Sequence, residues 1–314
     1  MIYTLALNPA IDRTMWVERM DFHATTRVRR ESRYPGGKGI DVSRVLTGLG
    51  VPNVALGFVG GFVGDELECR LGYEGVQTDM VRVSGETRTN IIVNETAGDG
   101  RHLLLTAKGP KIDPHELGTL FRKIENLSEP SMMAIGGSLP RGVHPDAYRR
   151  IITIMKRKGA MTILDADGDN LRSGIQAGPD YIKPNRHEMS ELVGRELNGL
   201  EEIVQAAEEV RSQGVGTVLV SMGADGMVAV GDGKRYLAIP PKVETVNNVG
   251  LGDSAVAGFM YGLANRFELK DCLVHGTAAG TATAMKPGTA RANREDVMAM
   301  VPRIDLRDLM RDEK

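Results

Sequence analysis

Short apolar runs alternate along the chain with longer segments in which apolar residues recur with a helical period. The short runs are typical of strands and span residues 2–7, 55–59, 132–135, 161–165, 181–183 and 217–221. The longer segments predict helices over residues 38–49, 64–74, 113–127, 146–158, 199–213 and 253–266. Strands that alternate with helices predict a mostly parallel sheet covered by helices on both faces. We therefore expect an α/β protein with three layers, α/β/α.

Two stretches depart from this alternation. Residues 11–34 and 86–105 contain extended segments with alternating polar positions and no helical pattern. A small second sheet, acting as a lid over one end of the main domain, accounts for both. Residues 226–230 and 234–239 predict a hairpin across a Gly-Asp-Gly turn. Since no repeat or linker divides the chain, we expect a single domain over residues 1–314 with the lid segments inserted in it.

Composition excludes several classes of protein. The 314 residues carry 39 Lys and Arg against 41 Asp and Glu, which gives a net charge of −2. This balance argues against a general electrostatic surface for nucleic acid or an anionic membrane. The two cysteines, Cys69 and Cys272, form no CxxC pattern, so a disulfide scaffold or zinc cluster is not expected. The sequence predicts a cytoplasmic protein without nucleic-acid or membrane partners.

Glycines open a predicted helix at Gly250-Leu251-Gly252-Asp253. Backbone N–H groups at such a position point outward at the positive end of the helix dipole and suit phosphate oxygens. A carboxylate at an anion site would repel the anion, so its presence there indicates another role. Asp253 could accept the proton of a hydroxyl that attacks phosphorus. The alternative is that Asp253 caps the helix and the glycines form a tight turn.

A second group of glycines, Gly36-Gly37-Lys38-Gly39, also opens a predicted helix. Lys38 could place a positive charge near a phosphate, and the exposed amides could meet sugar hydroxyls. The alternative is a strand–helix turn with a solvated lysine. The GxxxxGK[ST] spacing of a Walker A loop is absent.

These motifs and others occur in the order of a known family. They are found at residues 7–12, 36–39, 86–90, 136–140, 183–188, 221–226 and 250–253. The sequence resembles the PfkB carbohydrate kinases of the ribokinase-like superfamily, in the branch that phosphorylates hexose phosphates. This resemblance implies ATP-dependent phosphorylation of a ketohexose phosphate, fructose 1-phosphate giving fructose 1,6-bisphosphate, with 6-phosphofructokinase or tagatose-6-phosphate kinase activity as alternatives. It also implies a homodimer formed through the lid.

The resemblance further implies a role for each matching residue. Asp253 would be the catalytic base, and the amides around Gly250 and Gly252 would form its anion hole. The sugar-phosphate side would comprise Asp12, Arg27, Gly37, Lys38, Asp41, Arg88 and Ser138, of which Arg27, Lys38 and Arg88 would hold the substrate's own phosphate. The ATP side would comprise Lys183, Asn185, Ser221, Gly223, Gly226, Thr245 and Thr281. Mg²⁺ would be organised through water by Asn185 and Glu188, with Asp165 as an additional partner.

Some of these residues have structural alternatives. Glu188 also fits a carboxylate that begins a helix, and the arginines near Arg27 fit a solvated basic strand. The sequence departs from the family at Asp41, where Asn is usual, and at Leu251, where a small residue is usual. Asp41 should therefore either bond a sugar hydroxyl or pair with a neighbouring cation. Leu251 leaves open a sensor of sugar phosphate or nucleotide without turnover, and a kinase for an unphosphorylated sugar or nucleoside is a further alternative.

Overall fold

A large twisted sheet forms the centre of the molecule, as seen in the computed structural model, which describes residues 1–97, 100–246, 249–286 and 291–310. Within these residues the sheet has 11 strands, in the order β15-β14-β13-β12-β11-β10-β9-β1-β4-β5, with β6 paired to β4. Its parallel strands are β1 (Ile2–Ala6), β4 (Asn53–Val59), β5 (Gln77–Thr78), β6 (Val81–Arg82), β9 (Met132–Gly136), β10 (Met161–Asp165), β11 (Tyr181–Ile182) and β12 (Thr217–Ser221). An antiparallel edge follows, made of β13 (Met227–Gly231), β14 (Lys234–Ile239) and β15 (Asp305–Asp308).

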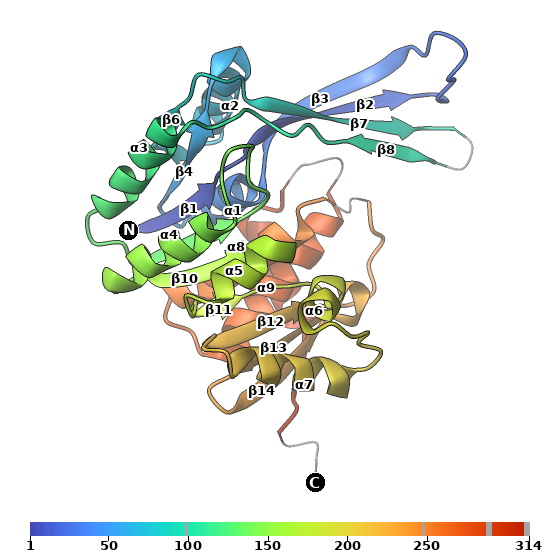
Figure 1. Ribbon diagram of the computed structural model, residues 1–314. Helices are drawn as coiled ribbons and strands as arrows, with labels where there is room; N and C mark the ends of the chain where they lie inside the picture. Colours follow the sequence, from blue (N-terminus) through green and yellow to red (C-terminus); the bar gives the residue numbers. More distant parts are fainter. Residues whose placement is uncertain (98–99, 247–248, 287–290, 311–314) are drawn as a thin grey trace.

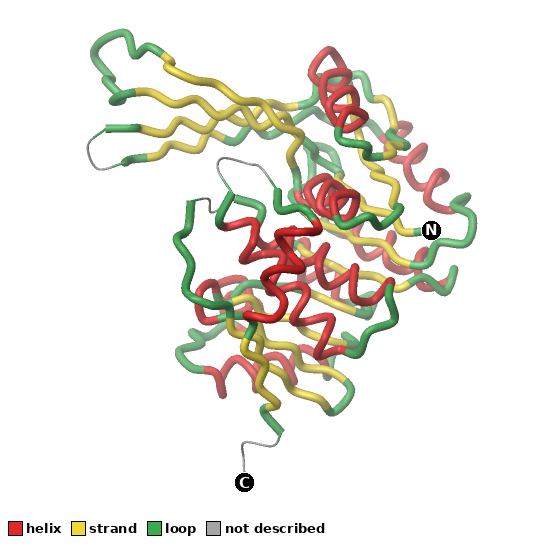
Figure 2. The backbone as a smooth tube through the Cα atoms, turned by 180° about the vertical axis from the view of Figure 1, so that it is seen from behind, coloured by secondary structure: helices red, strands yellow, loops and turns green. Residues whose placement is uncertain are grey.

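Helices cover both faces of this sheet, as the views from front and back show (Figures 1 and 2). One layer comprises α3 (Pro114–Glu125), α4 (Asp146–Arg157), α5 (Gly168–Ile175), α6 (Arg186–Val193) and α7 (Leu200–Arg211). The other comprises α1 (Lys38–Gly48), α8 (Leu251–Ala264), α9 (Leu269–Ala284) and α10 (Arg294–Met300). The helix α2 (Gly61–Tyr73) packs near the β4 edge, against Ile40 of α1. The predicted three-layer fold is confirmed.

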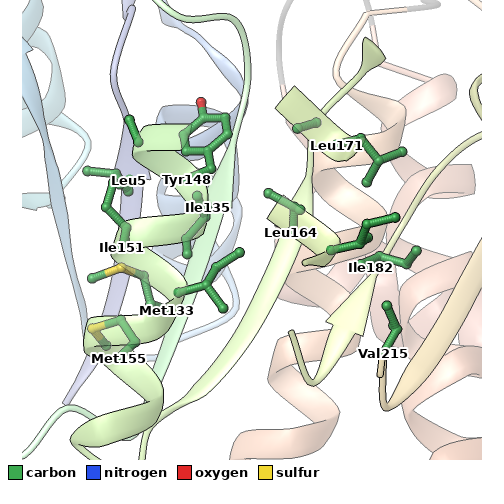
Figure 3. Packing of buried hydrophobic residues seen from close by; sticks show 14 of the residues in the cluster. Leu5, Met133, Ile135, Tyr148, Ile151, Met155, Leu164, Leu171, Ile182 and Val215 are labelled. Carbon is green, nitrogen blue, oxygen red and sulfur yellow. The ribbon is translucent and has the colours of Figure 1, made fainter. Parts of the chain in front are cut away.

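The core between the sheet and the first helix layer is built from large apolar side chains. Figure 3 shows Leu5 and Ile135 of the sheet beside Tyr148 and Ile151 of α4. Every residue of β1 is buried, because helices cover both sides of a parallel sheet and leave no strand face for water. This explains why the strands appear in the sequence as continuous apolar runs.

The second helix layer uses small residues instead. At Gly258 of α8, an added Cβ would lie 2.4 Å from the carbonyl oxygen of His275, so α8 and α9 approach each other at backbone distance. A helix rich in Gly, Ala and Thr and buried on most sides shows no amphipathic period. For this reason the sequence pattern does not predict α9. The short helices α5 and α10 were also missed, and α6 was anticipated only as the structural alternative for Glu188.

A separate sheet projects from the main body beyond the end of β1 (Figure 1). It has the order β3-β2-β7-β8, made of β2 (Ala10–Val17), β3 (Val28–Gly36), β7 (Arg88–Glu95) and β8 (His102–Leu105). The strands β2 and β7 are parallel, and the other pairs are antiparallel. The predicted smaller sheet is confirmed at the expected residues. No helix in the described part of the chain is long and apolar enough to cross a membrane.

Candidate active site

The N-terminal turn of α8 is the centre of the candidate site. Gly250 caps the helix in the left-handed conformation, with φ 73°. The first helical hydrogen bond is donated by the amide of Ser254 to the carbonyl of Gly250, at 3.0 Å. The amides of Leu251, Gly252 and Asp253 therefore lack partners within the helix and point out of its N-terminus. The turn that the sequence predicts as an anion hole has the backbone arrangement that such a hole requires.

Asp253 lies in this turn and is 8% exposed. It is not the helix cap, because Gly250 occupies that position and no side chain caps α8. Burial raises the pKa of Asp253 to about 8, and the negative charges of Asp41 and Asp165 add to this effect while Lys38 and Arg291 oppose it. A carboxylate with a pKa near neutrality is suited to accept and release a proton.

Two lysines and one aspartate meet beside this turn. The Nζ atom of Lys38 donates to Oδ1 of Asp165 at 2.8 Å, and Nζ of Lys183 lies 3.1 Å from Oδ2. Burial would raise the pKa of Asp165, but the charges of Lys183 and Lys38 hold it below its usual value. Burial would likewise lower the pKa of Lys38, but the neighbouring carboxylates of Asp165, Asp253 and Glu188 raise it. The lysines also lie close to the mouth of the anion hole, where a Cβ on Gly252 would lie 3.1 Å from Nζ of Lys183.

The predicted sugar side gathers where the small sheet meets β1. Oδ1 of Asp12 accepts a hydrogen bond of 2.8 Å from Asn90, across neighbouring strands. Arg88 donates to the carbonyl of Asn8 at 2.8 Å and reaches Oγ of Ser138 at 3.4 Å. Burial raises the pKa of Asp12 to about 6, with a further contribution from Asp41.

Two predicted sugar-side residues lie on α1. Gly37 caps this helix, and a Cβ there would lie 3.2 Å from Cα of Pro9. Asp41 is buried and accepts from Nη1 of Arg44 at 3.1 Å, with Nη2 of Arg291 at 2.7 Å. Of the two expectations for Asp41, the structure therefore has the pairing with a cation.

Arg27 is not brought to this group. It is exposed and immediately precedes β3, which runs antiparallel to β2. Val28 pairs with Val17 at one end of β2, whereas Arg88 pairs with Ala10 at the other. Seven residues of strand separate the two ends by roughly 23 Å. The expectation that Arg27 and Arg88 hold one phosphate is therefore wrong for a single chain, because the strand direction places them at opposite ends of the sheet.

Five of the seven predicted ATP residues line one cavity of about 530 Å³, whereas Lys183 lies beside Gly252 and Asn185 lines a different hollow. The wall of the cavity includes Ser221, Gly223, Gly226, Thr245 and Thr281, all named from the sequence. Leu251 and Gly252 of the anion hole also line it. The cavity therefore extends from the β12–β13 turn to the first turn of α8. Its apolar surface, to which Met227, Val243 and Ala255 contribute, suits the flat face of a base.

Asn185 and Glu188 form a reciprocal cap at the start of α6. Oδ1 of Asn185 accepts from the amide of Glu188 at 2.9 Å, and Oε2 of Glu188 accepts from the amide of Asn185 at 2.8 Å. Glu188 is thus a carboxylate at the start of a helix, which was the structural alternative to a metal role. Its other oxygen, Oε1, lies 3.9 Å from Nζ of Lys38, beyond hydrogen-bond distance, so it can still accept from a metal-bound water.

The residues fit Mg²⁺ only in this indirect way. Within the residues that the structure describes, no group of three or more His, Cys, Asp or Glu side chains could hold a metal ion. Lys38 contacts one oxygen of Asp165 and Lys183 the other, so Asp165 orients both lysines. Each carboxylate oxygen can accept a further hydrogen bond, and the role of Asp165 as an additional Mg²⁺ partner through water stays a prediction. A hard ion that keeps its waters and is held mainly by ATP phosphates needs no more than the free oxygen of Glu188.

Sequence reasoning missed Arg291, whose guanidinium lies against Gly250 and Asp41. No local motif surrounds it, and the contact exists only in the folded chain. It also missed Asn8 and Asn90 as site residues, although both lie inside recognised motifs. A polar residue directly after β1 was the available signal for Asn8, because ligands gather at the carboxyl ends of parallel strands.

Comparison with known proteins agrees with this geometry. The family model for pfkB family carbohydrate kinase matches residues 5–296. The chain belongs to this family. It is 34% identical over 311 residues to a 1-phosphofructokinase of Borreliella burgdorferi, covering 98% of this chain and 99% of that relative. A 1-phosphofructokinase of Bacillus subtilis is 35% identical over 284 residues, covering 90% and 92% of the two chains.

A solved structure also resembles this one closely. Phosphofructokinase-2 from Escherichia coli, in complex with fructose-6-phosphate, superposes with a TM-score of 0.89 and 28% identity over 96% of this chain and 98% of that one. The family, the fold and the phosphotransferase class predicted from the sequence are confirmed. The roles of individual residues remain predictions.

Proposed function

We propose that this kinase transfers the γ-phosphoryl group of ATP to a hydroxyl of a ketohexose phosphate, converting fructose 1-phosphate to fructose 1,6-bisphosphate. The observation that carries the proposal is the placement of Asp253 in the α8 turn, whose Leu251 and Gly252 line a cavity suited to a nucleotide. The charge of Asp41 acts on both Asp253 and Asp12, which links this turn to the sugar side. The names of two curated relatives, both 1-phosphofructokinases, support this choice of substrate.

The chemistry follows from these positions. Asp253 accepts the proton of the acceptor hydroxyl as its oxygen forms a bond to the γ-phosphorus, and the bond to the β-phosphate oxygen breaks to release ADP. The amides of the α8 turn and the charges of Lys38 and Lys183 stabilise the oxygens of the transferring group, since positioning and electrostatics provide most of the catalysis in such transfers. Bound Mg²⁺ supplies further charge neutralisation on the phosphates.

Arg88 holds the anionic acceptor in this proposal. Burial lowers the pKa of Arg88 from its usual value, although Asp12 opposes this, and the guanidinium remains a cation at any physiological pH. Its Nη2 atom already reaches Oγ of Ser138, which places the cation and a hydroxyl donor at the same point. Charge-assisted bonds of this kind contribute on the order of 1.5–3 kcal/mol each. Lys38 donates one hydrogen bond to Asp165, and its ammonium has further N–H groups with which it can contact the acceptor phosphate while keeping this ion pair.

A second substrate has a specific observation in its favour. The similar Escherichia coli phosphofructokinase-2 is described in complex with fructose-6-phosphate, which makes this sugar the leading alternative acceptor. We also infer a homodimer formed through the small sheet, which presents the exposed apolar side chains Leu104 and Leu105 on β8. Dependence on ATP favours a cytoplasmic site of action.

An ADP-release assay with Mg·ATP tests the proposal. Purified protein is offered fructose 1-phosphate, fructose 6-phosphate, tagatose 6-phosphate, fructose and adenosine, and the product is identified by mass. We expect the highest kcat/KM with fructose 1-phosphate. Preference for fructose or adenosine would indicate an acceptor without its own phosphate. Tight binding of sugar phosphate and ATP without product would select the sensor instead.

A further inference from the structure

Arg291 is bound directly to the turn that opens α8. Its side chain is 5% exposed, and Nη2 lies 2.7 Å from Oδ1 of Asp41 on α1. Nη1 is 3.5 Å from the carbonyl oxygen of Val249, the residue before the helix cap. A Cβ on Gly250 would lie 2.5 Å from Nη2 and 2.6 Å from Cζ. The guanidinium therefore lies on the backbone of the cap residue, and a side chain at position 250 would displace it, in addition to the strain of the positive φ.

A second link joins the same segment to the same turn. The amide of Ala292 donates to Oγ1 of Thr283 at 3.3 Å, this hydroxyl donates to Oγ of Ser254 at 2.9 Å, and Ser254 donates to the carbonyl of Gly250 at 2.8 Å. Both hydroxyls are fully buried. Because each accepts one hydrogen bond and donates one, the chain from Ala292 to Gly250 is complete and has a single direction.

Asp41 in turn is fixed from its other side. Nη1 of Arg44 lies 3.1 Å from Oδ1 of Asp41 and 3.0 Å from the carbonyl of Pro35, and Arg44 also makes a two-pronged pair with Glu74 at 2.6 and 2.9 Å. Charges thus alternate from Glu74 through Arg44 and Asp41 to Arg291. A buried network of this kind adds little net stability compared with apolar residues, since each ion must lose its water. Its geometry fixes the guanidinium of Arg291 in one place.

We propose that Arg291 and Thr283 are positioning residues that hold the α8 turn in the conformation that presents its free amides and Asp253 to the substrates. We call Asp41, Arg291, Thr283 and Ser254 the turn clamp. Its two arms act on adjacent peptide groups: Arg291 on Val249 and Gly250, and the hydroxyl chain on the carbonyl of Gly250. The catalytic part of this inference rests on the proposed function, because it assumes that the turn binds the transferring phosphoryl group.

Substitution of Arg291 tests the first arm. R291M keeps the apolar volume of the side chain but loses its charge and the several N–H donors of the guanidinium. R291K keeps the charge alone. We expect R291M to lower kcat about 10²-fold, as a misplacement of about 1 Å does in other sites, with KM for both substrates little changed. R291K should recover part of the loss. The matched control is R211M, because Arg211 also bonds a carboxylate and a backbone carbonyl, those of Glu208 and Gly216 at 2.8 and 2.9 Å.

Hydrogen–deuterium exchange provides a readout that does not depend on turnover. The peptide that contains Gly250 to Asp253 should exchange faster in R291M than in the parent, and at the parental rate in R211M. If the parent phosphorylates no sugar phosphate, the proposed function fails while this measurement still tests the clamp. Unchanged exchange, unchanged kcat, or a raised KM at constant kcat would each overturn the inference, the last by showing direct contact with substrate.

The second arm keeps the inference testable if R291M does not fold. In T283V the hydroxyl is lost with the shape preserved, whereas T283S keeps the hydroxyl. We expect T283V to increase exchange of the α8 turn and to lower kcat, and T283S to do neither. If both Thr283 variants behave like the parent in exchange and in kcat, the hydroxyl chain does not position the turn.

Discussion

Gly36 and Asp12 face each other across the small sheet so closely that a Cβ on Gly36 would lie 2.2 Å from Oδ2 of Asp12. Gly36 ends β3 and Asp12 lies on β2, where its other oxygen accepts from Asn90. The bare glycine therefore provides the space in which the carboxylate of Asp12 is held. A residue with any side chain at position 36 must displace this carboxylate.

We expect Gly36→Ala to affect the sugar site indirectly, by displacing Asp12 rather than by contacting the sugar. The displaced Asp12 should raise KM for the sugar phosphate, in the same direction as Asp12→Ala, and leave KM for ATP unchanged. Steady-state kinetics with each substrate varied in turn measures both constants. Gly72→Ala is the matched control, because a Cβ at Gly72 would have nothing within 4 Å. Equal sugar KM values for Gly36→Ala and the parent would contradict the assignment of Asp12.

Asp253→Asn removes the proposed base while keeping its shape. We expect kcat to fall by about 10²–10⁴-fold, the usual contribution of general-base catalysis. In the parent, the base works only when ionised, so its raised pKa predicts that kcat/KM increases with pH and levels off above about 8. A pH–rate profile measures this limb, and the residual activity of Asp253→Asn should lack it. A variant as fast as the parent would refute the role of Asp253.

The raised pKa of Asp253 also affects the stability of the protein. The folded protein holds a proton on Asp253 up to about pH 8, whereas the unfolded chain releases it near pH 3.8. The folded state therefore binds more protons in this interval, and the free energy of unfolding falls as pH rises through it. Urea unfolding at pH 5 and pH 8.5 should show a smaller loss in Asp253→Asn than in the parent.

Much of the fold and half of the site follow from local patterns. The parallel strands were evident because strands buried on both faces must be apolar throughout, as β1 is. The helix α9 was not evident, because close packing at Gly258 and His275 replaces an amphipathic face with small residues. Asp253 was found because a carboxylate among helix-opening glycines is chemically unusual. The separation of Arg27 from Arg88 within one chain and the contacts of Arg291 were not evident, since strand direction and contacts between distant segments are not local properties.

Glu188 offers a way to separate capping from metal chemistry. Glu188→Gln keeps an oxygen that can accept from the amide of Asn185 but loses the negative charge facing Lys38. We expect its stability to change little and the Mg²⁺ concentration for half-maximal rate to rise. Asn185→Ala, which loses the cap, should reduce the free energy of unfolding by about 1 kcal/mol. Magnesium titrations together with urea unfolding distinguish the two effects, and an unchanged magnesium requirement in Glu188→Gln would exclude the proposed metal role.

Leu251 lines the cavity on the side of the anion hole, beside Thr281 and Ala255. Truncation in Leu251→Ala removes apolar contact with a nucleotide, and the loss of such a contact is worth about 1–3 kcal/mol. We expect KM for ATP to rise about 10-fold while KM for the sugar phosphate stays constant. Isothermal titration with a non-hydrolysable ATP analogue provides a control independent of turnover. A large gain in kcat instead would mean that Leu251 crowds the γ-phosphate.

Asp41→Asn restores the residue that is usual in the family, yet the structure predicts a loss. The carboxylate neutralises Arg44 on one side and Arg291 on the other, with all three side chains at most 5% exposed. Removing one partner of a buried pair leaves an uncompensated charge and costs roughly 3–5 kcal/mol. We expect Asp41→Asn to reduce the free energy of unfolding in urea by this order.

The companion variant separates charge balance from sugar recognition. In Asp41→Asn with Arg291→Met, one negative and one positive charge leave the network together, so the double variant should be more stable than Asp41→Asn alone. The kcat of the double variant should stay low, because the clamp on the α8 turn is still absent. If Asp41→Asn instead keeps its stability and changes the ranking of sugar phosphates, Asp41 contacts the sugar and its pairing with Arg291 opens when substrate binds.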